Sequence, residues 1–249
     1  MKKICLINVG ANSSHRNLES VLFSNGHFEF VPIPDPCMEG SKIGVRFNQL
    51  LVFNGVRITE LVAKKYHEKF AHNDPEFATY TYGDYPAHHP RAANLKKLEK
   101  GDWLFFFARL VPWSKERNLG KPKFGLIGFI EIEGVYKNIL QKPPKSTFKE
   151  IRNNAHIIRA ESNDFFYDGF WIFRGSKNSS RFRRAVIFDR NFITQCGITD
   201  VKGQEIEWER FSSELAAIGS YFRSSRLIDS EEQIHFFWHK VLNEQITCP

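Results

Sequence analysis

The chain has 249 residues, 42% of them hydrophobic and 25% charged, which excludes intrinsic disorder and predicts a sizeable core. Lys and Arg number 35 against 28 Asp and Glu, giving a formal net charge of +7 that favours partners carrying phosphate groups. The four cysteines are widely scattered and no apolar run reaches the length of a membrane span, so we expect a cytoplasmic protein without a disulfide framework.

The N-terminal part is predicted to combine short strands with irregular segments. An apolar run that ends at Gly10 predicts a buried strand over residues 3–9. The alternation in residues 28–31 predicts a second strand, and the three prolines in residues 32–36 exclude a helix after it. Apolar residues with helical spacing then predict a helix over residues 57–71.

The middle of the chain is predicted to hold a helix followed by two long strands. Pro90 suits the first position of a short helix, and Gly101 suits its C-terminal cap. Strands are predicted over residues 103–110 and 124–135. Gly125 and Gly128 interrupt the second strand, which indicates a bulge or a tight barrel corner.

The C-terminal part is predicted to contain two short strands and two helices. The strands cover residues 170–173 and 185–188 and flank a basic segment, and the helices cover residues 209–222 and 229–242. Residues 141–145 are the one candidate junction between two halves of the chain.

Two stretches of the middle part resemble the signature of EVE and related PUA-like domains. In residues 91–107, a short helix with Arg, Asn and Leu precedes Gly101-Asp102 and an aromatic strand. The return strand of that family is matched by Gly-Leu-Ile-Gly-Phe-Ile-Glu-Ile, residues 125–132. The resemblance covers about residues 80–136, roughly a quarter of the chain, and implies a PUA-like barrel.

A longer resemblance, to the third family of nucleotide-modification-associated domains, covers nearly the whole chain. The motifs that carry it are Val9-Gly10, residues 26–35, Asp74-Pro75-Glu76-Phe77, Tyr82-Gly83-Asp84, Gly101-Asp102 and the segment from Arg174-Gly175-Ser176 to Ala185. Together the two resemblances imply an α+β fold, a PUA-like (EVE/ASCH-like) mixed β-barrel with N-terminal and C-terminal elaborations. They imply one elaborated domain over residues 1–249, with the core at 74–190 and C-terminal helices at 205–245. The implied role is the handling of modified nucleotides in DNA modification or phage defence.

A barrel of this class holds a flipped base by stacking it on rings and by hydrogen bonds to its edge. The candidates for base binding are Tyr80, Tyr82, Asp84, Tyr85, His88, His89, Asn94, Phe107 and Trp113. Any single ring among them is more often core, and Trp113 is the strongest candidate because it lies in a charged loop.

Basic and small polar residues supply candidates for phosphate binding. These are Arg16, Arg91, Gly175, Ser176, Ser180, Arg181 and Arg184. Backbone N–H groups and guanidinium forks of this kind can hold a phosphate. A solvated hairpin tip is an equal alternative for the loop that includes Arg181, and a plain polar loop is favoured for Arg16.

The sequence is compatible with three functions. The favoured one is a non-catalytic reader of a modified base, with DNA preferred to RNA as partner and no membrane association. The second is an enzyme that modifies or removes a base, with Asp35, Asp84, His88 and His89 as acid–base candidates. The third is a protein-interaction subunit. No phosphate loop, dinucleotide fingerprint or nucleophile elbow is present, so no cofactor is expected. Asp84, His88 and His89 could bind a metal, but adjacent histidines point apart on a strand, so a polar turn is favoured there and no metal is expected.

Overall fold

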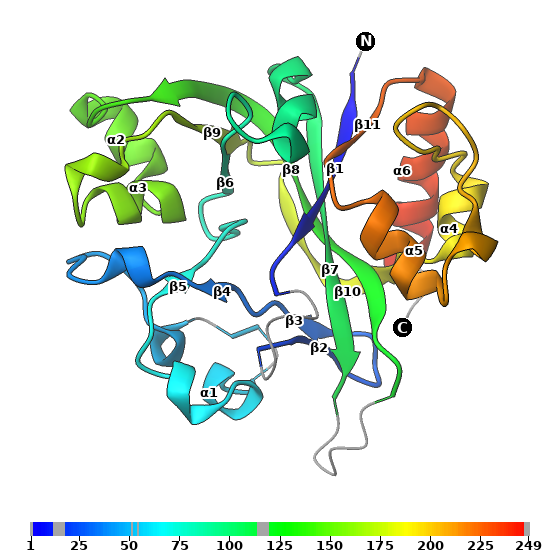
Figure 1. The fold of residues 1–249 in the computed structure, drawn as a ribbon, viewed down its shortest axis with the longest axis horizontal. Coiled ribbons are helices and arrows are strands. Elements are labelled where there is room, and N and C mark those ends of the chain that lie inside the picture. Colours follow the sequence, from blue (N-terminus) through cyan, green and yellow to red (C-terminus); the bar gives the residue numbers. More distant parts are fainter. Residues whose placement is uncertain (1, 12–17, 51, 54, 114–119, 247–249) are drawn as a thin grey trace.

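The computed structural model describes residues 2–11, 18–50, 52–53, 55–113 and 120–246, and these form a mixed α+β fold around a strongly curled sheet (Figure 1). The strands are β1 (Ile4–Val9), β2 (Ser20–Leu22), β3 (Phe28–Glu29), β4 (Ile33–Pro34), β5 (Ala71–His72), β6 (Thr81–Asp84), β7 (Trp103–Pro112), β8 (Lys123–Ile139), β9 (Phe170–Gly175), β10 (Ser180–Ile187) and β11 (Arg226–Ile228). The α-helices are α1 (Ile58–Leu61), α2 (Lys145–Ile151), α3 (Ala155–Ala160), α4 (Arg190–Gln195), α5 (Glu214–Tyr221) and α6 (Glu231–Ile246). Short 3-10 helices include η1 (Pro36–Met38), η2 (Phe47–Gln49), η3 (Lys64–Tyr66) and η4 (Pro90–Lys97).

The long hairpin of β7 and β8 organises the sheet, whose order is β11-β1-β7-β8-β9-β6. β1 runs parallel to the first part of β7, and β2 runs parallel to its end. β8 is long enough to pair with β10 along its first part and with β9 along its second part. The sheet therefore curls into a half-barrel, compatible with the barrel-like fold expected from the sequence (Figure 1).

Strand β7 is buried on both faces, which explains its continuous apolar sequence. Phe105 packs edge-to-face on Phe237 of α6, at a ring-centroid distance of 4.9 Å. Phe106 points to the opposite face, where its centroid lies 5.2 Å from the ring of Tyr82. Much of the aromatic content of the chain thus fills the core on the two sides of one strand.

The predicted bulge in the return strand is confirmed at Gly128. The register between β7 and β8 shifts between Phe106 and Phe107, opposite Gly128. Gly128 has φ 159°, and a Cβ there would lie 2.6 Å from the backbone oxygen of Ser180 and 2.7 Å from the ring of Phe77. Only glycine lets β10 and Phe77 approach the backbone this closely.

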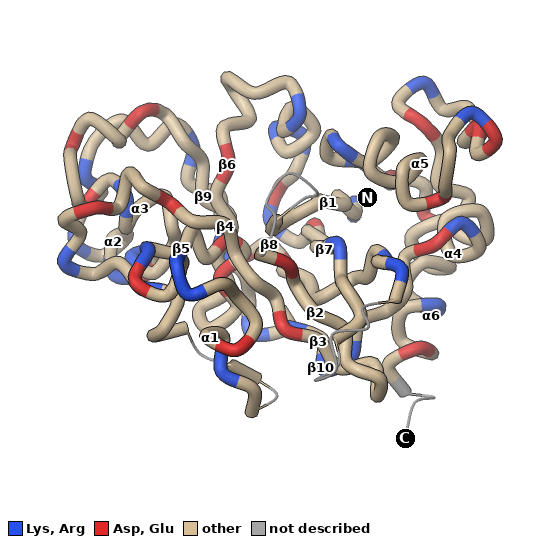
Figure 2. The backbone as a smooth tube through the Cα atoms, turned by 60° about the horizontal axis from the view of Figure 1, so that its bottom comes forward, with Lys and Arg blue, Asp and Glu red and all other residues tan. Residues whose placement is uncertain are grey.

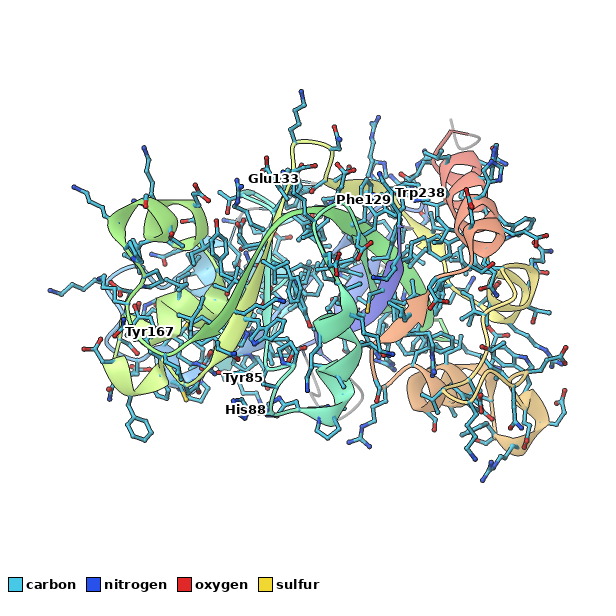
Figure 3. The ribbon with its side chains drawn as sticks, turned by 90° about the horizontal axis from the view of Figure 1, so that it is seen from above. Tyr85, His88, Phe129, Glu133, Tyr167 and Trp238 are labelled. Atoms are coloured by element: carbon cyan, nitrogen blue, oxygen red, sulfur yellow. The ribbon has the colours of Figure 1, made fainter. Side chains whose placement is uncertain are left out.

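Helices and small elements cover the two sides of the sheet (Figure 1). Helices α4, α5 and α6 pack on one side, and on this side Trp238 of α6 lies over Phe129, as seen from above in Figure 3. The β4–β5 pair and helices α1, α2 and α3 lie on the other side. Among the described residues, no helix is long and apolar enough to cross a membrane.

The predicted helix over residues 57–71 is wrong. Only α1 and η3 form, because Val62 is extended (φ −116°, ψ 152°) and directs its side chain into a small cluster with Phe47 and Ile58. The end of the predicted helix instead becomes β5, which pairs with β4. The predicted strand over residues 28–31 is limited to β3, and α2, α3 and α4 were not anticipated.

Candidate functional site

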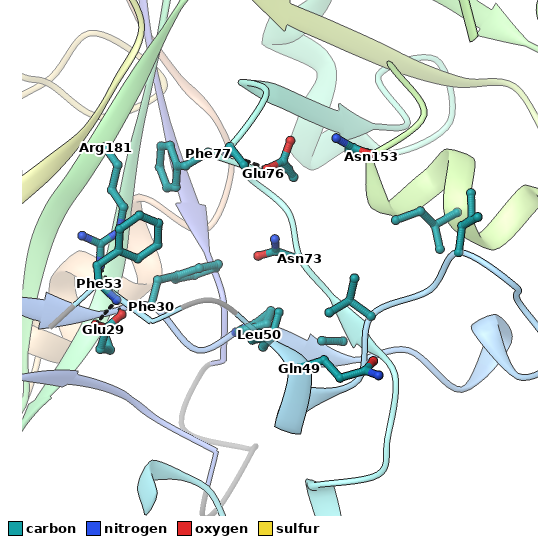
Figure 4. Close-up of a pocket in the computed structure, with 16 residues that line it drawn as sticks. Glu29, Phe30, Gln49, Leu50, Phe53, Asn73, Glu76, Phe77, Asn153 and Arg181 are labelled. Carbon is teal, nitrogen blue, oxygen red and sulfur yellow. Dashed lines mark hydrogen bonds and ion pairs between the residues drawn. The ribbon is translucent and has the colours of Figure 1, made fainter. Parts of the chain in front are cut away.

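A cavity of about 250 Å³ lies between the sheet and the N-terminal segments (Figure 4). Its apolar lining comes from separate parts of the chain, with rings from Phe30, Phe53 and Phe77 and aliphatic groups from Leu50 and Ile158. The volume is near the lower end of ligand pockets, which span about 300–1,000 Å³. Such a space suits one planar ring system better than a large ligand.

The side chain of Asn73 lies at the centre of this cavity, between the phenylalanine rings and Gln49 and Asn153 (Figure 4). Within the described residues, its carboxamide has no hydrogen-bond partner, whereas the Gln49 side chain accepts from the backbone of Arg46 at 3.0 Å. The edge of a carboxamide presents one N–H donor beside one carbonyl acceptor. Asn73 is therefore a central polar group that a bound ligand can use in full.

One wall of the cavity is a buried ion pair between Arg181 and Glu29. The Nη2 and Oε2 atoms are 3.3 Å apart, and the two side chains are 9% and 2% exposed. The guanidinium lies 3.9 Å from the ring centroid of Phe53. Burial lowers the pKa of Arg181 to about 10, although Glu29 opposes the shift. Glu29 therefore balances the charge of Arg181 at the cavity wall, and the guanidinium of Arg181 holds the Phe53 ring in place.

A tight turn presents Phe77 to the cavity. The carboxylate of Glu76 accepts hydrogen bonds from the backbone N–H groups of Ala78 (2.5 Å) and Thr79 (2.9 Å) and from the Thr79 hydroxyl. Glu76 lines the cavity but its oxygens are committed to this turn. Its role in the site is to position the neighbouring ring.

The chain from Ala71 to Asp74 separates the cavity from a buried polar cluster. Ala71 and Asn73 line the cavity. The residues that alternate with them, His72 and Asp74, belong to the cluster. His72 Nδ1 lies 2.9 Å from Oδ2 of Asp35. His156 Nε2 lies 3.5 Å from Oδ2 of Asp74. The two imidazoles pack edge-to-face at 4.9 Å, so the two His–Asp pairs form one unit.

The burial of this unit changes its acid–base properties. Burial raises the pKa of Asp74 well above its ordinary value, against the hydrogen bond donated by the Gly83 N–H group at 2.8 Å. Burial and the neighbouring His72 lower the pKa of His156 well below its ordinary value. Burial also opposes ionisation of Asp35, but its hydrogen bond and attraction to His72 leave the pKa of Asp35 lowered. Perturbed groups gathered in this way are typical of functional sites.

Five of the residues identified in the sequence lie around this cluster. Burial raises the pKa of Asp84, while Tyr82 donates a 2.8 Å hydrogen bond to it. The Tyr85 ring contacts both His89 (5.1 Å) and His156 (5.2 Å). Arg159 donates to the Tyr85 hydroxyl and lies 3.3 Å from Nδ1 of His156. His88 is exposed at the same edge, close to Tyr85 (Figure 3).

Other residues identified as base-binding lie elsewhere. Phe107 is 0% exposed and packs on Phe188 in the core. Asn94 donates to the backbone oxygen of Ser225 at 2.8 Å. Tyr80 is half-buried against the main core. Trp113 packs on Phe23 at the end of β7, with a centroid distance of 5.4 Å.

Several polar groups of the basic hairpin between β9 and β10 are engaged within the protein. The Gly175 N–H group donates to Tyr80 (2.7 Å), and the Ser176 hydroxyl donates to the carboxylate of Glu131 (2.7 Å). The Ser180 hydroxyl donates to the Arg181 carbonyl (3.1 Å). The Arg184 side chain packs on Gly26. Arg16 lies outside the described residues.

A second hollow, of about 650 Å³, is lined by three arginines, Arg91, Arg109 and Arg223. Among its described lining residues there is no Asp or Glu, although Glu19 lies 3.8 Å from Arg109. Elsewhere Lys and Arg are spread over the tube with Asp and Glu between them (Figure 2). Gly10 lines this hollow and abuts Phe30, which lines the cavity, since a Cβ on Gly10 would lie 2.7 Å from that ring. The two hollows therefore share a wall.

Sequence reasoning missed the cavity residues Phe30, Phe53, Asn73 and Phe77, and the cluster residues His72, Asp74 and His156. The spacing of His72 and Asp74, two apart beside a short strand, was a usable signal for side chains on one face. His156 carried no local signal, because its contact with Asp74 depends on how α3 packs beside β6.

Comparison with known protein families gives a match over most of the chain. A family model described as nucleotide modification associated domain 3 matches residues 3–224. This range includes the cavity, the polar cluster and the arginine-lined hollow. No curated protein and no solved structure matches the chain.

Proposed function

Because the chain belongs to the nucleotide modification associated domain 3 family, we propose that it binds a modified nucleobase in the cavity around Asn73. The family ties the chain to nucleotide modification, and the cavity supplies what a base requires. Phe30, Phe53 and Phe77 offer ring faces and edges, and base–aromatic stacking contributes about 1–3 kcal/mol per base.

The observation that carries this proposal is the carboxamide of Asn73 in the centre of the ring-lined cavity, with no partner in the described part of the chain (Figure 4). An asparagine can pair with a base edge through one donor and one acceptor at once. Discrimination follows, because a bound base that lacks the matching groups covers the amide and leaves it unpaired. The small volume limits the ligand to a single base and its modification.

The arginine-lined hollow provides the phosphate contacts in this proposal. Arg91, Arg109 and Arg223 converge from three segments on a space that adjoins the cavity through Gly10 and Phe30. Guanidinium groups bind phosphate oxygens through paired charge-assisted hydrogen bonds. A base flipped out of DNA can then enter the cavity while its backbone lies along the arginines.

We also propose that the half-barrel is of the PUA-like class. The support is the arrangement of η4, the following turn and the β7–β8 hairpin. Asp102 in this turn accepts hydrogen bonds from the backbone N–H groups of Lys3 (2.8 Å) and Glu99 (2.9 Å) and so fastens the helix to β1. An experimental structure that superposes β1, β7, β8 and β10 on a known PUA-like barrel tests this assignment.

The His–Asp cluster favours a second candidate function, an enzyme that modifies or removes the base. His72 is partly exposed, and its ring is oriented by Asp35 as a general base requires. Asp84 and His89 lie close by. In this candidate function the cavity positions the base and the cluster moves a proton.

The test of base binding compares Asn73→Leu with Asn191→Leu, which alters an exposed asparagine on α4. DNA oligonucleotides with and without modified bases are titrated against each variant and against the unchanged protein. We expect Asn73→Leu to abolish the preference for one modified base and Asn191→Leu to retain it. An unchanged preference in Asn73→Leu contradicts the proposal. The second candidate function predicts that His72→Gln still binds the modified DNA but no longer converts or removes the base.

A further inference from the structure

We propose that His72, Asp74 and His156 form a binding site for a divalent transition metal ion. One candidate ligand atom from each residue lies within 4.8 Å of the other two. With metal–ligand distances of about 2.0–2.2 Å, the ligand atoms of a tetrahedral site lie about 3.3–3.6 Å apart, so the side chains need to close by up to about 1.5 Å. This proposal is independent of base binding.

The donor set determines which ions fit. Two imidazoles and one carboxylate are the ligands that Fe²⁺ and Zn²⁺ use in proteins, and Mg²⁺ and Ca²⁺ prefer oxygen alone. Three protein ligands also leave at least one coordination position open, as in catalytic sites and unlike closed structural sites. His72, whose side chain is 17% exposed, provides the side from which an ion and a further ligand can enter.

The surroundings of His72 match the second shell of a metal site. Its Nδ1 atom is bound to Asp35, which leaves Nε2 for an ion. Asp35 is itself fixed by the backbone N–H group of Cys37 at 2.9 Å. Carboxylate–histidine pairs of this kind set the tautomer and orientation of metal-binding histidines.

Asp74 gives an independent indication of a ligand. Its Oδ2 atom accepts from the Gly83 N–H group, but its Oδ1 atom is buried and has no hydrogen-bond partner in the described part of the chain. The side chain is 3% exposed. A buried carboxylate oxygen without a partner is costly, and a bound cation removes that cost.

Arg159 sets a condition on metal binding. Its Nη2 group lies 3.3 Å from Nδ1 of His156, an arrangement that keeps the proton of that ring on Nε2. Coordination through Nε2 requires the proton to move to Nδ1, and Arg159 must then turn from His156. Arg159 retains its hydrogen bond to the Tyr85 hydroxyl, so it does not lose all its partners.

A second histidine pair must be removed before the test. His235 and His239 lie one turn apart on α6 with ring centroids 4.6 Å from each other, and such a pair can bind metal on its own. The experiment therefore uses the full chain with His235→Ala and His239→Ala, stripped with EDTA and dialysed. Co²⁺ is titrated by visible absorption, and Zn²⁺ is then added in competition.

We expect one equivalent of Co²⁺ with nitrogen and oxygen ligation, displaced by Zn²⁺. His72→Gln, at the partly exposed edge of the cluster, should weaken binding at least 100-fold, and Asp35→Asn should weaken it about 10–100-fold. His67→Gln, a matched change at a histidine whose ring lies against the Val62 carbonyl oxygen at 3.2 Å and outside the cluster, should bind as the parent does. Circular dichroism identifies variants that are unfolded, and a Zn²⁺-dependent rise in the Tm of the parent supports the site without any variant. No stoichiometric binding by the parent, or equal binding by His72→Gln, overturns the proposal.

Discussion

Asp74 and His156 face each other in the protein interior, with Oδ2 and Nε2 3.5 Å apart, although they come from widely separated parts of the chain. Burial raises the pKa of Asp74 and lowers the pKa of His156, so both shifts favour the neutral forms. A neutral pair avoids the desolvation cost of two buried charges. The contact joins α3 to the segment that separates the cavity from the cluster.

The lowered pKa of His156 predicts a loss of stability in mild acid. The unfolded chain takes up a proton on this histidine near its ordinary pKa of about 6.5, whereas the folded protein resists protonation to lower pH. Its contribution to stability is therefore full above about pH 6.5 and falls below it, by up to about 1.4 kcal/mol per pH unit. The raised pKa of Asp74 acts in the opposite direction in both proteins, so urea unfolding at pH 7.5, 6.5 and 5.5, with EDTA present, measures the His156 contribution as the difference between the unchanged protein and His156→Gln. His156→Gln should show a smaller decline, and an equal decline in both proteins contradicts the prediction.

Arg181 is predicted to stabilise the cavity wall. Removing its guanidinium deletes the 3.3 Å ion pair with the buried Glu29 carboxylate, and breaking a buried pair in this way costs about 3–5 kcal/mol. Arg181→Met should lower the free energy of unfolding by an amount in this range, measured by urea denaturation. Arg183→Met, at an exposed position of the same strand, serves as the control and should change stability by less than about 0.5 kcal/mol. Similar small effects of both changes are incompatible with the assigned role.

The arginine-lined hollow is predicted to set the salt dependence of DNA binding. Arg223 is exposed, and each lost phosphate contact should lower the slope of log K against log salt by about 1. Arg223→Ala should therefore reduce the slope, with little change in base preference, in titrations between low and moderate salt. Arg152→Ala, an exposed arginine after α2, is the comparison. If the two variants give the same slope as the unchanged protein, the phosphate contacts lie elsewhere.

The cysteines should differ sharply in reactivity. Burial raises the pKa of Cys5 and that of Cys196 to about 12, so their thiolates are scarce at neutral pH. Cys37 is exposed. In a Cys248→Ser background, iodoacetamide at pH 7.5 should label Cys37 alone in the native state and all three thiols after denaturation. Peptide mass spectrometry checks this, and rapid native labelling of Cys5 would contradict the burial of β1.

The sequence carried strong local signals for the centre of the fold. The apolar run of β7 and the glycine at the bulge of β8 act on neighbouring residues, so both could be anticipated. The helix predicted over residues 57–71 failed because the extended backbone at Val62 is fixed by packing against Phe47 from an earlier segment. Local periodicity does not report such a contact.

The candidate site was accessible to sequence reasoning only in part. Asp84 and Tyr85 were identified from the ring-rich segment, and they lie beside the His–Asp cluster. The cavity was not found, because Phe30, Phe53 and Phe77 come from separate segments with no common motif. The polar groups of the basic hairpin between β9 and β10 were expected to bind phosphate, yet several of them are engaged in contacts that only the folded chain reveals, such as that of Ser176 with Glu131.

The most direct test of base binding is the nucleoside content of the nucleic acid retained by the protein. The unchanged protein and Asn73→Leu are each incubated with digested genomic DNA that contains modified bases, washed, and analysed by nucleoside mass spectrometry, with RNA fragments in parallel. The account predicts that the unchanged protein enriches one modified deoxynucleoside over the input and that Asn73→Leu does not. Retention of unmodified nucleosides in the input ratio by both proteins contradicts it.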